Sequence, residues 1–295
     1  MSTEDLDTNF IDIDKWTSSE AIAAMATGQF AALEAVKAAS SALGQAVDAA
    51  KQRLENSKGR LAYVGAGTSG RVAVQDGVEL NPTFGWPWER LVFAMAGGTV
   101  ALMQAVENAE DDVEAGAHAM QDANIGKDDV VIGVAASGKT PYTLSAMRAA
   151  KANGALTIGI SNNPNTPLLE IAEIGILLET GPEPLAGSTR LKAGTSQKIA
   201  LNLFSTALMI AMGGAYNGYM VGMIATNAKL RARATQIVKS LTNVSQEVAA
   251  DAVVQAQGNL KIAVLIALGL GSEKCGDLLA LSHGNLREAI KRASL

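Results

Sequence analysis

Cysteine and histidine are nearly missing from this chain of 295 residues. Cys275 is the single cysteine, so no internal disulfide can form and a site built from several thiolates is excluded. His118 and His283 are the only histidines, and we interpret both as surface or helix-packing residues. The sequence therefore predicts no metal centre and no cofactor.

An excess of positive charge is also lacking, because 24 Lys and Arg residues oppose 29 Asp and Glu residues, for a formal net charge of −5. Such a chain has no general electrostatic affinity for nucleic acid, so we expect no DNA or RNA partner. Residues 1–7 are acidic and lack the basic and apolar regions of an export signal. A cytoplasmic location is the expectation.

One apolar stretch, residues 199–226, is long enough to resemble a membrane span. Asn202, Ser205 and Tyr216 interrupt it, and small residues gather near its end. We therefore expect a buried central helix or a subunit interface, and no membrane partner.

From residue 59 onward, short apolar runs alternate with helical segments. The runs are typical of buried parallel strands, and they are Leu61–Val64, Leu91–Met95, Val130–Val134, Leu156–Ile160 and Ile174–Leu178. The expected helices between and after them are Val72–Leu80, Val100–Asn108, Val113–Asp122, Thr143–Ala152 and Leu168–Ala172. This alternation predicts an α/β fold with a doubly wound, mainly parallel five-stranded sheet that binds ligands at the carboxyl ends of its strands.

Helical sequence precedes and follows the predicted sheet. Residues 17–20 have the spacing of a capping box, and residues 21–54 then have helix-forming composition interrupted only by glycines. Near the other end, residues 258–261 recur as residues 284–287, which indicates two similar helical hairpins. We therefore divide the chain into an N-terminal helical arm (1–56), a sheet domain (57–238) and C-terminal helical hairpins (239–295).

Two hydroxyl-rich turns follow separate predicted strands. They span residues 65–71 and 136–142, and each combines Ser and Thr hydroxyls with backbone N–H groups at an expected helix start. The helix macrodipole favours an anion there, so the two turns together predict a phosphate cradle. Ser69 and Ser137 could instead only cap their helices. The two roles are compatible, and we favour the cradle.

The first turn also fits the G-x-G-x-x-G pattern of dinucleotide-binding domains. That function requires an acidic residue at the end of the second strand, where this chain has residues 96–99, Ala-Gly-Gly-Thr. A P-loop is nearly matched, but Arg71 and Val72 replace the Lys and Ser or Thr that hold phosphates and magnesium. Nucleotide binding is therefore the second choice, after a smaller phosphoester held without metal.

Acidic residues lie near both turns. Glu79 is expected at the end of the first helix, where the negative end of the dipole disfavours a carboxylate and suits a general acid. Glu107, Glu110, Asp111 and Asp112 form a cluster between two expected helices. Glu79 could equally be an exposed helix-terminal residue, and the pattern alone favours a solvated turn for the cluster, with a helix cap in it.

These motifs resemble those of the N-acetylmuramic acid 6-phosphate etherases, in the sugar isomerase (SIS) fold superfamily, over most of the chain. The strongest similarities are residues 65–71, 135–142 and 187–198, the last reading Gly-Ser-Thr-Arg-Leu-Lys-Ala-Gly-Thr-Ser-Gln-Lys. Residues 81–85, 105–111 and 225–230 add support. The tandem Gly-Asn-Leu tail is similar to the helical C-terminus of that family.

The resemblance implies a carbon–oxygen lyase that cleaves the lactyl ether of N-acetylmuramic acid 6-phosphate by elimination and hydration, as in peptidoglycan recycling. The products would be D-lactate and N-acetylglucosamine 6-phosphate. Glu79 matches the acid position of the family and Glu110 its second catalytic glutamate. The implied substrate-binding residues are Thr68, Ser69, Ser137 and Thr140 for the phosphate, Ser188, Thr189 and Lys192 for the sugar, and Gly67, Gly138 and Lys139 beside them. A homodimer with sites near its interface is also implied.

Three departures from the family pattern bear on substrate identity. The family usually has Glu-Cys-Pro-Pro where this chain reads Glu79-Leu80-Asn81-Pro82, and Lys139 replaces the usual Arg, which removes a planar fork for phosphate. Gly222 stands where Asp is usual. Two other functions stay open: a sugar-phosphate isomerase using the same cradle, and a non-catalytic sensor of sugar phosphates.

Overall fold

The computed structural model describes residues 2–294 and divides the chain into two compact units. Unit 1 is Met1–Gly77 with Glu89–Ser205, and unit 2 is Val78–Trp88 with Thr206–Leu295. The sheet and the arm helices belong to unit 1, and the C-terminal helices belong to unit 2. The division into three parts at residues 56 and 238 stays a prediction.

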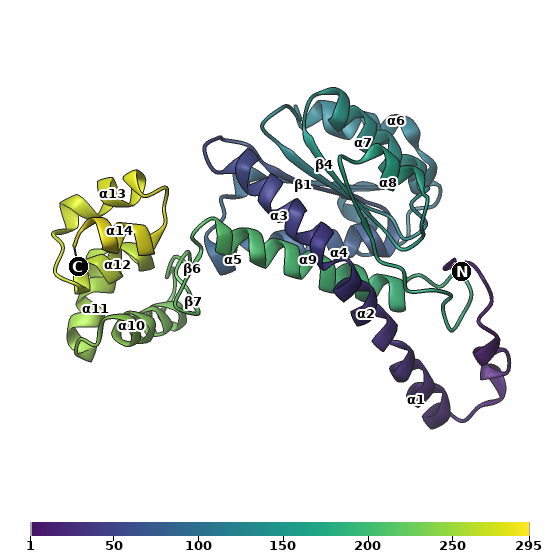
Figure 1. Ribbon diagram of the computed structural model, residues 1–295, viewed down its shortest axis with the longest axis horizontal. Helices are drawn as coiled ribbons and strands as arrows, with labels where there is room; N and C mark the ends of the chain where they lie inside the picture. The colour runs from purple at the N-terminus through teal and green to yellow at the C-terminus, as the bar shows by residue number, and fades with distance from the viewer. Residues whose placement is uncertain (1, 295) are drawn as a thin grey trace. The chain divides into compact units, whose positions relative to one another are not determined.

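A five-stranded parallel sheet forms the centre of unit 1 (Figure 1). Its strands are β1 (Leu61–Gly65), β2 (Leu91–Met95), β3 (Val130–Val134), β4 (Leu156–Ser161) and β5 (Ile174–Leu177). The order β2-β1-β3-β4-β5 reverses direction between β1 and β3, where open α/β sheets bind ligands. The last residues of these two strands, Gly65 and Val134, are paired. The two predicted cradle turns therefore start side by side at the switch point.

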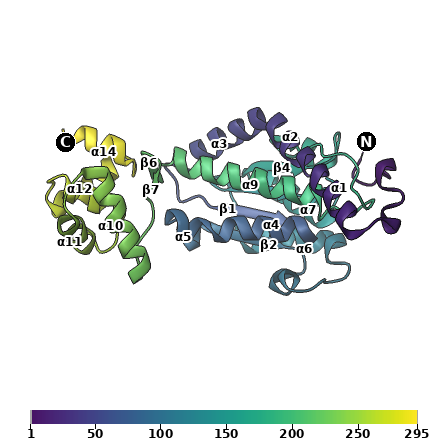
Figure 2. The ribbon, with the colours of Figure 1, turned by 90° about the horizontal axis from the view of Figure 1, so that it is seen from below.

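Helices cover both faces of the sheet, so the doubly wound α/β prediction is confirmed. One face packs against α6 (Val113–Asp122), α7 (Pro141–Ala152) and α8 (Pro167–Ile171) in a shared apolar core. The other face carries α3 (Ser40–Leu54), α4 (Gly67–Val78) and the first part of α9 (Lys192–Ala211), which lie across it in Figure 2.

Asp76 is a buried carboxyl group on α4, on this second face. It accepts hydrogen bonds from the hydroxyls of Tyr63 on β1 (3.2 Å) and Ser205 on α9 (3.1 Å). Burial raises the pKa of Asp76, and the hydrogen bond from Ser205 and the charge of Lys198 only partly oppose that shift. This side chain ties the first helix, the sheet and α9 together, and so fixes the position of the helix that starts in the first cradle turn.

The N-terminal arm is helical, as predicted, but it consists of three helices. They are α1 (Ser18–Gly28), α2 (Phe30–Ala38) and α3, with breaks at Gln29 and Ala39. The predicted capping box is present: Thr17 Oγ1 accepts from Glu20 N (3.3 Å), and Glu20 Oε2 accepts from Thr17 N (2.8 Å). None of the residues of α1 is buried.

The predicted helix over residues 100–108 is wrong. Only the 3₁₀ turn η4 (Gly98–Leu102) forms, and the chain then turns repeatedly. Arg71 on α4 explains this, because its guanidinium donates to the carbonyls of Ala101 (2.9 Å) and Gln104 (3.3 Å). Those carbonyls are the acceptors a continuing helix would have used. The other 3₁₀ turns are η1 (Thr8–Phe10), η2 (Ile13–Lys15), η3 (Trp88–Arg90) and η5 (Ala109–Asp111).

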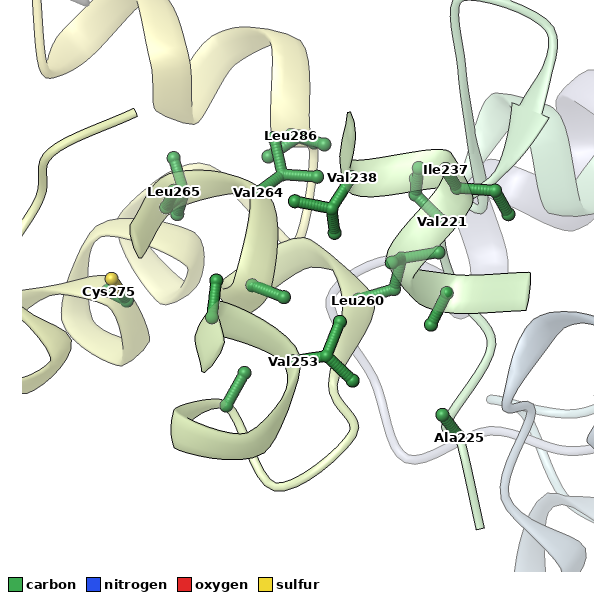
Figure 3. Close-up of a cluster of buried hydrophobic side chains, with 14 of the residues drawn as sticks. Val221, Ala225, Ile237, Val238, Val253, Leu260, Val264, Leu265, Cys275 and Leu286 are labelled. Atoms are coloured by element: carbon green, nitrogen blue, oxygen red, sulfur yellow. The ribbon is translucent and has the colours of Figure 1, made fainter. Parts of the chain in front are cut away.

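Unit 2 is mainly helical and has its own apolar core (Figure 3). Its helices are α5 (Leu80–Phe84), α10 (Ala228–Thr242), α11 (Gln246–Gln255), α12 (Leu260–Ala267), α13 (Ser272–Leu281) and α14 (Leu286–Arg292). A short hairpin, β6 (Ala215–Tyr216) with β7 (Tyr219–Met220), follows α9 within the apolar stretch of residues 199–226. Within residues 2–294, no helix combines the length and apolarity needed to cross a membrane.

The sequence repeat in the tail corresponds to a structural repeat. Asn259 and Asn285 are the N-caps of α12 and α14, and each side chain accepts from the backbone N–H three residues later at 3.2 Å. The preceding residues, Gly258 (φ +81°) and Gly284 (φ +71°), both have left-handed backbone conformations that favour glycine. The Gly-Asn pair is thus the entry turn of a capped helix in both copies.

Replacing either cap by alanine is expected to destabilise the tail by about 1 kcal/mol, because an N-terminal N–H of the helix loses its acceptor. The two changes, Asn259→Ala and Asn285→Ala, can be compared by urea denaturation followed by circular dichroism. Asn285→Ser keeps a capping hydroxyl and is the matched control. Equal loss in the serine and alanine variants would contradict the assignment of Asn285 as a cap.

Candidate active site

Two glycines shape the first cradle turn. A Cβ atom on Gly65 would lie 2.8 Å from Gly70 Cα, and one on Gly70 would lie 2.7 Å from the Gly65 carbonyl oxygen. Strand β1 and helix α4 therefore approach each other more closely than side chains would allow. The G-x-G-x-x-G pattern has a packing explanation here that requires no dinucleotide.

The hydroxyls of this turn lie in the first turn of α4. Thr68 is half-buried and Ser69 is buried, and they are the second and third residues of the helix. They are accordingly inside the helix and do not occupy its N-cap. Backbone N–H groups in a first helical turn have no partner within the helix, so hydroxyls and free N–H groups come together at this end.

The second turn has a similar arrangement at the start of α7. Ser137 Oγ accepts from Lys139 N (3.2 Å), and Thr140 is the N-cap of α7 although its side chain makes no capping hydrogen bond. Ser137 and Thr140 are half-buried, Gly138 is buried, and Lys139 is exposed. The interpretation of Ser137 as only a helix cap is therefore wrong, because the cap position belongs to Thr140.

The third motif packs against the first turn. A Cβ atom on Gly194 would lie 3.1 Å from the Thr68 methyl carbon, and Gly194 N donates to the Thr189 carbonyl (2.9 Å). Ser188 and Thr189 are half-buried in the turn before α9. The structure thus brings Thr68 and Thr189, which are far apart in the sequence, to the same place.

A buried acid fixes the start of α9, and the sequence analysis missed it. Glu183 is fully buried and accepts hydrogen bonds from the backbone N–H groups of Lys192 (2.9 Å) and Ala193 (2.8 Å). Lys192 is itself buried. A carboxylate at a helix N-terminus is stabilised by the dipole. Glu183 lies too far before the helix in sequence to have any capping-box signal.

The N-terminal segment joins the second turn to the third motif, which the sequence also did not predict. Thr3 is fully buried, its N–H donates to Asn163 Oδ1 (2.9 Å), and its carbonyl accepts from Gly187 N (3.1 Å). Asn163 Nδ2 also donates to the Ala136 carbonyl (3.1 Å), next to Ser137. The Asn163 side chain therefore links the backbone of Thr3 to the backbone of Ala136.

Glu110 lies beside the first turn. It lines a pocket of about 230 Å³ together with Ala66, Gly67 and Glu107. Its own side chain is exposed, as η5 places it at the surface. The helix cap predicted for Asp111 or Asp112 is Asp112, since its side chain accepts from Ala115 N at the start of α6 (2.8 Å). The acidic cluster thus contains both a helix cap, Asp112, and a residue that lines a pocket, Glu110.

Glu79 directly follows α4, as predicted, and its side chain is exposed. Asn81 and Pro82, which follow Glu79 closely, lie within a second short helix, α5. Glu79 is therefore also the N-cap residue of α5, where the partial positive charge favours a carboxylate, against the effect of the α4 end. It belongs to unit 2, whereas the turns and Glu110 belong to unit 1.

Comparison with known proteins identifies the family of this chain. Residues 98–207 match the SIS domain family, and residues 42–151 match the N-terminal SIS domain of glucokinase regulatory protein. The N-acetylmuramic acid 6-phosphate etherase of Deinococcus radiodurans is 49% identical over 289 residues, which are 98% of this chain and 94% of that protein. The chain belongs to the N-acetylmuramic acid 6-phosphate etherase family.

Further relatives support that membership. The etherase of Rubrobacter xylanophilus is 43% identical and that of Actinobacillus pleuropneumoniae serotype 5b is 40% identical, each over 98% of this chain. The matches cover 96% and 95% of those proteins. The similarity therefore includes the helical tail as well as the sheet.

One departure from the usual pattern of this family has a local explanation. Gly222 packs so closely against the end of α5 that a Cβ atom there would collide with the backbone of Phe84. The aspartate usual at this position would not fit without moving that segment. The helix α5 contains both Asn81, one of the changed residues after Glu79, and Phe84, against which Gly222 packs. The two departures from the family pattern are therefore close to each other in space.

Proposed function

We propose that this chain cleaves the lactyl ether of N-acetylmuramic acid 6-phosphate, giving D-lactate and N-acetylglucosamine 6-phosphate. The observation that carries the proposal is 49% identity to an etherase over nearly the whole chain. The pocket that Glu110 lines together with Ala66 and Gly67 also supports the proposal, because it lies at the start of α4, where a helix favours an anion.

In this reaction a base removes the C2 proton of the open-chain sugar, which is acidified by the adjacent aldehyde. The C3–O bond then breaks, a C2=C3 double bond forms, and an acid protonates the departing oxygen of lactate. Water adds its oxygen to C3 and a proton to C2, which gives the second product. Glu110 is the base in this proposal and Glu79 the acid, each acting by general acid–base catalysis.

The cradle turns would hold the phosphate. Thr68, Ser69, Ser137 and Thr140 would supply hydroxyls beside free N–H groups of α4 and α7, with Gly67 and Gly138 allowing close approach. Lys139 would add a mobile point charge, since its side chain is exposed. Ser188, Thr189 and Lys192 would line the sugar site.

The remaining assignments follow from the family. We propose a homodimer that acts in the cytoplasm in peptidoglycan recycling. Exposed apolar side chains on the arm and on α9, including Phe30 (69% exposed) and Ile210 (53% exposed), support burial against a second copy.

Incubation with N-acetylmuramic acid 6-phosphate tests the function directly. We expect stoichiometric release of D-lactate, measured with a lactate dehydrogenase assay, and appearance of N-acetylglucosamine 6-phosphate by mass spectrometry. Aldose–ketose interconversion of hexose phosphates without lactate release would identify an isomerase instead. Binding of a 6-phosphosugar by calorimetry with no turnover would identify a sensor.

A further inference from the structure

Arg71 faces the pocket that Glu110 lines, and its role is not explained by the cradle. The residue lies on α4 after the first turn and is half-buried. Its Nε donates to the Ala101 carbonyl and its Nη2 to the Gln104 carbonyl. A guanidinium has five N–H donors, so three are left over. Among residues 2–294 no carboxylate forms an ion pair with Arg71.

The surroundings of this guanidinium are chemically mixed. Arg71 is the one basic residue among those that line the pocket, and Glu107 and Glu110 are the acidic ones. The rest of the wall is mostly small and apolar, with Ala66, Met95, Ala96, Ala101, Ala105, Val106 and Ala109. A ligand group that suits this pocket has a small apolar part and one negative charge directed at Arg71.

The lactyl group has this chemistry, since it carries one methyl group and one carboxylate. It is attached at C3, next to the C2 proton that Glu110 would remove, so it must lie close to Glu110. The carboxylates of Glu110 and of the lactyl group would then repel each other, and a nearby cation would offset that repulsion. Arg71 is the cation that the pocket provides.

We propose that Arg71 binds the lactyl carboxylate and selects ethers of 2-hydroxy acids over uncharged ethers. This inference rests on the proposed function. The carbonyls of Ala101 and Gln104 hold one side of the guanidinium, so its planar fork is already oriented when the substrate arrives. A substrate without the charge leaves the partly buried guanidinium unpaired, which is how a polar site rejects the wrong ligand.

The test compares two substrates that differ only at this group. One is N-acetylmuramic acid 6-phosphate, and the other is its lactyl amide, in which a neutral carboxamide of similar shape replaces the carboxylate. For Arg71→Gln we expect the acid-to-amide ratio of kcat/KM to fall by about 10- to 100-fold, the range for a hydrogen bond to a charged group. Arg71→Lys keeps the charge but loses the fork, so the same ratio should fall less.

Arg148→Gln is the matched control, because Arg148 is exposed on α7 and lines no part of this pocket. Its acid-to-amide ratio should equal that of the unchanged protein. If Arg71→Gln lowers turnover of acid and amide by the same factor, Arg71 only holds the loop after β2 and the proposal is overturned. Where the glutamine variant does not fold, the lysine variant decides by the same ratio.

A failure of the proposed function can be told apart from a failure of this inference. If the unchanged protein forms N-acetylglucosamine 6-phosphate from neither substrate, the etherase assignment is wrong. Calorimetric affinities of the acid and the amide for the unchanged protein and for Arg71→Gln then decide whether Arg71 binds the carboxylate. Equal affinity of the two compounds for the unchanged protein would overturn it.

Discussion

Glu110→Gln is expected to lower the rate of lactate release by about 10²- to 10⁴-fold, the usual contribution of a positioned general base. Glutamine keeps the shape of the side chain but cannot accept the C2 proton. Because the proton transfer itself is lost, we expect kcat to fall much more than KM rises.

Exchange of the C2 proton with deuterated solvent separates the two glutamates. Glu110→Gln should abolish deuterium incorporation at C2, as measured by mass spectrometry of recovered substrate. Glu79→Gln should slow ether cleavage by a similar factor while C2 exchange continues, because the acid acts only on the departing oxygen.

Glu114→Gln is the control for both variants. Glu114 lies in the first turn of α6, is exposed, and lines no part of the pocket near the cradle. Its activity should match that of the unchanged protein. Full activity in Glu79→Gln or in Glu110→Gln would reject the role given to that residue.

Asp129→Ala is expected to reduce the free energy of unfolding by about 1–3 kcal/mol, the usual cost of leaving buried donors without their acceptor. Asp129 is buried just before β3 and accepts from Arg60 N (2.8 Å), Arg60 Nε (3.1 Å), Arg60 Nη2 (2.8 Å) and Gly126 N (2.9 Å). Its loss leaves Arg60 Nε and the backbone N–H groups of Arg60 and Gly126 without their acceptor, while the Arg60 Nη atoms keep the carbonyls of Ala123 and Asn124. Urea denaturation followed by circular dichroism measures the effect.

The same carboxylate makes stability depend on pH. Burial tends to raise the pKa of Asp129, but hydrogen bonds from Arg60 and Gly126 outweigh it and hold the pKa below the usual value of 3.8. A carboxylate with a lowered pKa stabilises the folded state above the unfolded value, and this stabilisation is lost as pH falls through the folded value. The stability difference between the unchanged protein and Asp129→Asn should therefore be constant near neutral pH and shrink below about pH 3.8.

Asp128→Ala is the neighbouring control, since Asp128 is exposed and adjacent in sequence. At every pH, the urea midpoint of this variant should equal that of the unchanged protein. If Asp129→Ala were no less stable than Asp128→Ala, the link between Arg60 and Asp129 would not contribute to stability.

Much of the fold could be predicted because its signals are local. Each strand of the sheet is a short apolar run bounded by turn residues, and the two tail helices begin at a repeated Gly-Asn pair. The helix predicted over residues 100–108 failed for the opposite reason. Its composition is helical, but Arg71, distant in sequence, takes the carbonyls of Ala101 and Gln104.

The site divides in the same way. The hydroxyl-rich turns after β1 and β3 could be predicted from local sequence, because glycines, hydroxyls and strand ends are adjacent along the chain. Three contacts became known only from the folded chain: Thr68 lies near the motif that contains Thr189, Glu110 shares a pocket with Gly67, and Glu183 accepts hydrogen bonds from the start of α9. These residues are far apart in the sequence, and the order of the strands in the sheet sets the distances between them. Spacing along the chain therefore cannot predict which of them meet.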